Sequence, residues 1–157
     1  MYIKPKRLVN LYEERMLEFL QTCIDENYKL HTQVSLSQFC EPVAIIDSKL
    51  HNFWLTSSVD ALITNNNYQP CLVVEFQSTY HDNPEARERD TKKLHLLTLA
   101  GVPLLYSRIK DLGLLHLYNQ NEQIIFNLFT GENRENATSL IKNYCPPSNL
   151  SHLPEIA

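Results

Sequence analysis

Two apolar runs, Val59-Asp60-Ala61-Leu62-Ile63 and Leu72-Val73-Val74-Glu75-Phe76-Gln77, decide the fold of this chain. Both are rich in residues that favour strands, and the Asn65-Asn66-Asn67 segment between them predicts a turn. Side chains alternate along a strand, so Glu75 and Gln77 share one face. The sequence therefore predicts a hairpin that brings Asp60 close to Glu75.

A close pair of carboxylates is typical of a metal site. Two such groups a few ångströms apart repel each other, so one of them loses its charge unless a cation lies between them. Carboxylate oxygens are the ligands that Mg²⁺ prefers. Asp60 and Glu75 are therefore candidate metal ligands.

A helix and a further strand follow the hairpin. Asn83-Pro84 predicts a helix start and Gly101 its end, after which the Val102–Tyr106 segment predicts a strand parallel to the Glu75 strand. Lys93 precedes Leu96 and Leu97 by three and four residues, which directs its stem along the buried face. Its ammonium group is expected to reach the sheet, whereas Lys92 is expected to be solvated.

Upstream, Asn10-x-x-Glu13 has the spacing of a capping box and predicts a helix start. Two interpretations of Glu13 stay open, a helix cap and a residue that reaches the metal site. The segment from His31 to Phe39 predicts an edge strand, and the segment from Glu41 to Asn52 is ambiguous between helix and strand. The apolar stripe of the first helix is expected to be Leu11, Tyr12, Met16, Phe19, Leu20, Cys23 and Ile24.

The candidate site residues occur in an ordered series: Asp60, Glu75-x-Gln77, His81 and Arg89-Asp90-x-x-Lys93. From about Asn10 to Arg108 this series resembles the PD-(D/E)XK nuclease superfamily, and within it the branch around very-short-patch-repair endonucleases and related bacterial nuclease-like domains. The resemblance implies an α/β fold with a restriction-endonuclease-like core, in which helices flank a mixed central sheet in αβββαβ order.

The resemblance also implies a function, metal-dependent hydrolysis of phosphodiester bonds in nucleic acid, with DNA as the expected substrate. Its catalytic residues would be Asp60, Glu75, Gln77 and Lys93, with Glu13, His81 and Asp90 as accessory residues. Asp60, Glu75 and Glu13 would hold Mg²⁺, for which Mn²⁺ would substitute. Gln77 departs from the pattern, because the superfamily usually has a lysine there; Lys93 would supply the missing charge.

The main alternative is a non-catalytic relative that keeps the fold to bind DNA or a partner protein. It is preferred if Asp60, Glu75 and Lys93 fail to converge, or if a structural hydrogen bond holds Asp60. A third interpretation treats all these residues as structural parts of a generic α/β domain.

Composition sets the remaining limits. The chain has 157 residues, enough for a single domain, which we place at residues 1–144, with 145–157 as an extended or mobile tail. A net charge of -4 disfavours coating of nucleic acid by bulk electrostatics, although basic residues accompany the motif.

Four widely spaced cysteines predict reduced thiols, with Cys23 and Cys71 in the core, and His95 and His116 are expected to be packed. The absence of a membrane-length apolar run predicts a cytoplasmic protein without membrane contact, and double-strand cleavage would favour a homodimer.

Overall fold

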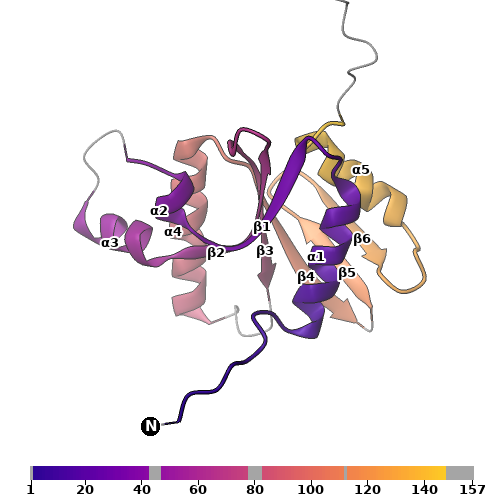
Figure 1. The fold of residues 1–157 in the computed structure, drawn as a ribbon, viewed down its shortest axis with the longest axis horizontal. Coiled ribbons are helices and arrows are strands. Elements are labelled where there is room, and N and C mark those ends of the chain that lie inside the picture. Colours follow the sequence, from indigo (N-terminus) through magenta and orange to yellow (C-terminus); the bar gives the residue numbers. More distant parts are fainter. Residues whose placement is uncertain (1, 43–46, 78–82, 112, 148–157) are drawn as a thin grey trace, which may run out of the picture.

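A six-stranded mixed sheet forms the centre of the protein (Figure 1). The structure, a computed structural model, describes residues 2–42, 47–77, 83–111 and 113–147. The strands lie in sequence order, and only β3 and β4 are parallel. The strands are β1 (Tyr28–Ser35), β2 (Ser58–Asn65), β3 (Pro70–Gln77), β4 (Leu104–Asp111), β5 (Leu114–Tyr118) and β6 (Gln123–Asn127). The helices are α1 (Leu11–Cys23), α2 (Leu36–Phe39), α3 (Ser48–Thr56), α4 (Pro84–Ala100) and α5 (Arg134–Tyr144).

The order of the main elements agrees with the sequence-based expectation. α1, β1, β2, β3, α4 and β4 follow one another in αβββαβ order, with α2 and α3 inserted between β1 and β2. The β2–β3 hairpin and the parallel β3–β4 pair are both present, so these two predictions are confirmed. Beyond β4, the chain forms two further strands, β5 and β6.

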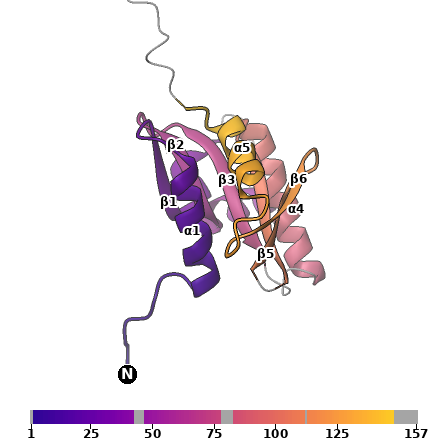
Figure 2. The ribbon, with the colours of Figure 1, turned by 90° about the vertical axis from the view of Figure 1, so that its right-hand side faces the viewer.

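Helices cover the sheet on two sides (Figures 1 and 2). α1 and α5 pack on one face, where Met16, Phe19 and Ile141 meet apolar side chains of β2 to β6. α2, α3 and α4 lie on the other face, where Leu97 packs with Val73 and Leu104. Successive side chains of β3 project from opposite faces of the sheet. Leu72, Val74 and Phe76 therefore belong to the first cluster, and Val73 belongs to the second. Glu75 and Gln77 project from the same face of the sheet as Val73.

The two long helices begin where the sequence predicts, and α4 also ends where it predicts. Asn10 and Glu13 form the complete capping box of α1. Asn83 caps α4 by accepting a hydrogen bond from the Ala86 backbone N–H at 2.7 Å. Gly101 ends α4 at φ 72, a left-handed conformation that glycine adopts without a steric penalty.

Other sequence-based expectations were wrong. The strand expected to continue to Phe39 ends at Ser35, because Ser35 and Gln38 form a capping box that starts α2. Leu11, expected in the apolar stripe, is 60% exposed because it occupies the outer side of the first turn. His95 is exposed on α4, and Cys71 is only half-buried near the start of β3.

The end of the chain is only partly described. α5, which the sequence did not predict, packs Ala137, Leu140 and Ile141 into the core. Cys145, the first residue of the expected tail, is 1% exposed, so the packed structure continues one residue beyond the predicted boundary. Residues 148–157 lie outside the described residues, and so do residues 43–46 of the ambiguous segment, whose residues 48–52 are helical in α3. No described helix is long and apolar enough to cross a membrane.

Candidate active site

A polar pocket of about 520 Å³ opens where the start of β2 meets the end of β3. Six of the seven residues named from the sequence line it: Glu13, Asp60, Glu75, Gln77, Asp90 and Lys93. The remaining lining residues are Asn10, Tyr12, Phe53, Thr56, Ser57, Ser58, Phe76 and Arg89. The pocket therefore collects side chains from α1, α3, β2, β3 and α4.

The hairpin brings Asp60 and Glu75 together, as predicted. The Asp60 backbone N–H donates to Glu75 Oε1 at 3.3 Å, and the Phe76 backbone N–H donates to Asp60 Oδ2 at 2.7 Å. Glu75 is buried with 5% exposure, whereas Asp60 is half-buried. Each acid is thus anchored to the neighbouring strand's backbone, and the bond from Phe76 is a structural hydrogen bond of the kind that the non-catalytic interpretation requires.

Lys93 reaches this pair from α4. Its Nζ donates to Glu75 Oε2 at 3.2 Å, and the Lys93 side chain is only 15% exposed. The helical spacing explains the reach, because Leu96 and Leu97 are buried on the same side of α4 and carry the lysine stem towards the sheet. Lys92 instead pairs with Glu88 at 3.3 Å and lies over the Phe53 ring, so it is more than a solvated side chain.

The environment of Glu75 raises the pKa of its carboxyl group to about 8. Burial is the main cause, and the negative charge of Asp60 adds to it. Lys93 acts in the opposite direction without cancelling these effects. At neutral pH Glu75 is therefore mostly protonated, and a cation that replaces the proton finds two oxygen-bearing groups already in place.

This shift predicts a pH dependence of stability. A glutamate in the unfolded chain ionises at about pH 4.3, whereas folded Glu75 keeps its proton up to about pH 8. Between these values the folded state binds more protons than the unfolded state, so the Glu75 contribution to the free energy of unfolding falls as pH rises. Above the folded pKa this contribution is lost.

Urea denaturation at several pH values between these limits measures the effect. The matched variant Glu75→Gln has no proton to lose at this position, so its free energy of unfolding should decline less steeply with pH than that of the intact protein. Equal slopes for the two proteins would show that Glu75 ionises normally in the folded state.

Gln77 is held at both ends of its amide. Its Nε2 donates to Asp90 Oδ2 at 3.2 Å, and the Tyr118 hydroxyl donates to its Oε1. Tyr118 lies on β5 and was not identified from the sequence, because its link to Gln77 depends on the order of three strands. Asp90 on α4 therefore fixes the Gln77 amide.

Glu13 remains at the rim of the pocket. Its carboxylate accepts a hydrogen bond from the Asn10 backbone N–H at 3.0 Å, which is the capping interaction. Within residues 2–42, 47–77, 83–111 and 113–147, no three acidic, histidine or cysteine side chains are grouped closely enough to hold a metal ion. The expected trio of Asp60, Glu75 and Glu13 is therefore not formed, because the helix cap holds Glu13. His81 lies outside the described residues.

Gln33 is a second residue that the sequence did not reveal. Its neighbours Thr32 and Val34 pair with β2, whereas Gln33 has φ 53 and lies opposite Asp60. Its Nε2 is 3.5 Å from Asp60 Oδ1, a long contact. The outer oxygen of Asp60 is therefore less firmly held than the oxygen bonded to Phe76.

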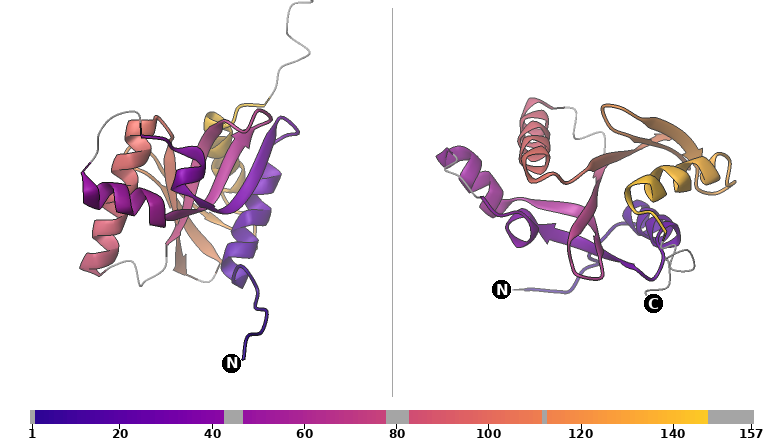
Figure 3. Two further views of the ribbon diagram at one scale, coloured as in Figure 1. Left: turned by 60° about the vertical axis from the view of Figure 1, so that its left-hand side comes forward. Right: turned by 90° about the horizontal axis from the view of Figure 1, so that it is seen from above.

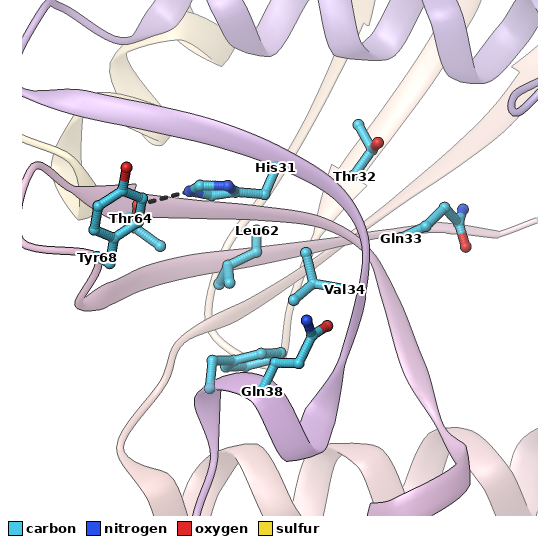
Figure 4. A pocket seen from close by; sticks show the side chains of 9 residues that line it. His31, Thr32, Gln33, Val34, Gln38, Leu62, Thr64 and Tyr68 are labelled. Carbon is cyan, nitrogen blue, oxygen red and sulfur yellow. Dashed lines mark hydrogen bonds between the residues drawn. The ribbon is translucent and has the colours of Figure 1, made fainter.

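Another pocket, of about 430 Å³, lies beside β1 (Figure 4). His31 and Thr64 share a 2.8 Å hydrogen bond there, and Gln38 and Tyr68 line the opening. Among the described residues that line it, none is a carboxylate or a lysine. The Asp60–Glu75 pocket is therefore the better candidate for acid–base or metal chemistry.

Comparisons with known proteins place the chain in a family. A protein from Haemophilus influenzae described as uncharacterized is 32% identical over 105 residues, which cover 65% of this chain and 54% of that protein. The match thus spans about half the length of this relative. No solved structure matches the chain significantly. The model of the family described as "Protein of unknown function (DUF2726)" matches residues 5–128, and the chain belongs to this family.

Proposed function

We propose that this protein is a metal-dependent nuclease with a restriction-endonuclease-like core. The observation that carries the proposal is the convergence of Asp60, Glu75 and Lys93 in one pocket, with Gln77 fixed beside them. The αβββαβ order and the resemblance to PD-(D/E)XK nucleases support the same assignment.

The donors of the pocket fit a hard divalent cation. Asp60 and Glu75 offer oxygen atoms from adjacent strands, and burial together with the charge of Asp60 raises the pKa of Glu75. Mg²⁺ commonly uses only one or two carboxylates and keeps several waters, so a third acid is not required. A bound Mg²⁺ would supply Lewis-acid polarisation of a phosphate oxygen and a lowered pKa for water.

The other side chains of the pocket have separate roles in this proposal. The Lys93 ammonium, which lies beside Glu75, would stabilise negative charge on the phosphate that is cleaved. Gln77 orients water through an amide whose direction Asp90 and Tyr118 set. Glu13 keeps the start of α1 at the rim of the pocket.

One observation favours a second candidate, a nuclease-like fold that binds DNA or a protein without cleaving it. Asp60 Oδ2 accepts the 2.7 Å hydrogen bond from Phe76, which is sufficient to explain the presence of an acid at this position. A carboxylate has several lone-pair positions, so this bond and metal binding are compatible. The two candidates therefore differ in whether Asp60 is needed for chemistry.

Nicking of supercoiled plasmid and cleavage of single-stranded DNA distinguish them. The nuclease proposal expects Mg²⁺ or Mn²⁺ to support cleavage by the intact protein, EDTA to stop it, and Asp60→Asn to abolish it. Asp60→Asn keeps an oxygen that accepts from the Phe76 N–H. If the intact protein cleaves neither substrate, with Mg²⁺ or with Mn²⁺, the binding module would be favoured.

A further inference from the structure

A strip of aromatic side chains leads away from the pocket across the sheet. The β3–β4–β5–β6 register aligns Glu75 with Tyr106, Tyr118 and Gln123, and aligns Gln77 with Arg108, His116 and Ile125. Registered partners project from the same face of a sheet. Six residues of β4 to β6 thus continue the surface on which the candidate site lies, and we call them the aromatic strip: Tyr106, Arg108, His116, Tyr118, Gln123 and Ile125.

The outer part of this strip lies on a face that the second core cluster does not reach. α4 and its neighbours bury residues of β2, β3 and β4, but this cluster contains no residue of β5 or β6. Leu115, Leu117 and Phe126 belong to the other core cluster, together with residues of α1 and α5. Figure 3 shows α1 and α5 together on one side of the sheet. His116 and Tyr118 are only half-buried, and Ile125 is 43% exposed.

The rings of the strip already contact one another. His116 and Tyr118 are stacked with ring centroids 4.5 Å apart, and the Tyr118 and Tyr106 rings are tilted with centroids 5.5 Å apart. The hydroxyl of Tyr118 also donates to Gln77, which connects the stack directly to the candidate active site. Arg108 gives the strip a cation, and none of its six residues is acidic although the whole chain carries a net charge of -4.

We infer that the aromatic strip binds single-stranded nucleic acid and leads it to the pocket, an inference that rests on the proposed nuclease function. An unpaired base stacks on an aromatic side chain at the end of such a strip, and the positive charge of arginine complements phosphate. The base pairs inside a duplex are stacked on one another, so their faces are not available to His116. The strip therefore favours an unpaired segment over a continuous duplex.

Binding in EDTA tests this inference without any cleavage. Fluorescence anisotropy with labelled oligothymidylate and with a duplex should show tighter binding of the single strand by the intact chain. His116→Ala should weaken single-strand binding by about five- to tenfold, since stacking contributes strongly per base. His116→Phe keeps an aromatic ring and should restore most of the affinity.

His95→Ala is the matched control, because His95 is an exposed histidine on α4 and does not belong to the strip. It should leave single-strand binding unchanged. The inference would be overturned if the intact chain bound no single strand or preferred the duplex, if His116→Ala bound like the intact chain, or if His95→Ala weakened binding equally. Single-strand binding without cleavage in Mg²⁺ would instead overturn the nuclease proposal and leave the strip as a binding surface.

Discussion

Glu75→Gln is expected to lower metal-dependent cleavage by at least about a hundredfold, the size typical of removing one group that stabilises the transition state. The substitution keeps the volume of the side chain and a hydrogen-bond acceptor for the Asp60 N–H. It removes the charge that a buried oxygen would contribute to a cation. Initial rates of plasmid nicking measure the loss.

Folding controls make this result interpretable. Glu75→Gln should remain folded, because neutral glutamine replaces an acid that is already mostly protonated at neutral pH. Gln69→Glu serves as a comparison, since it makes the reverse exchange of amide and acid in the β2–β3 turn, outside the pocket. Full nicking activity in folded Glu75→Gln would exclude Glu75 from the chemistry.

Lys93→Ala is expected to reduce cleavage by about a hundredfold as well, because Lys93 is the one lysine among the described residues that line the pocket. The neighbouring substitution Lys92→Ala removes the same charge from the same helix but affects only the contacts with Glu88 and Phe53. Its cleavage rate should stay within about twofold of the intact protein, as expected for an exposed ion pair.

The comparison of the two lysines separates a specific role from bulk charge. In Lys93→Ala, Glu75 loses its cationic neighbour, so its pKa should rise further and the variant should need a higher pH or more metal for residual activity. Similar losses in both variants would indicate that general attraction of phosphate, rather than the Lys93–Glu75 contact, explains the effect.

Local patterns in the sequence were sufficient to predict the core of the fold. The hairpin, α4 and the parallel strand each have their own signals: alternating apolar residues, Asn83-Pro84 and Gly101. α2 was missed because the Ser35–Gln38 capping box lies directly after a strand pattern. α5 was missed because Asn133, at φ 62, begins it without a side-chain capping hydrogen bond.

The candidate site was predictable only where its residues belong to neighbouring elements. Asp60 and Glu75 meet across a hairpin, and Lys93 follows from helical spacing, so all three were found. Tyr118 is 41 residues from Gln77, and its contact depends on the complete strand order. Gln33 reaches Asp60 through a left-handed backbone conformation for which the sequence contains no glycine signal.

The most direct test of the proposed metal site is calorimetric titration of Mn²⁺ into the intact protein near neutral pH, in two buffers with different enthalpies of ionisation. Because the pKa of Glu75 is raised to about 8, metal binding should release a proton, and the measured heat should differ between the buffers. Glu75→Gln should lose this difference together with most of the affinity. No binding by the intact protein, or equal binding by Glu75→Gln, would contradict a metal site at Asp60 and Glu75.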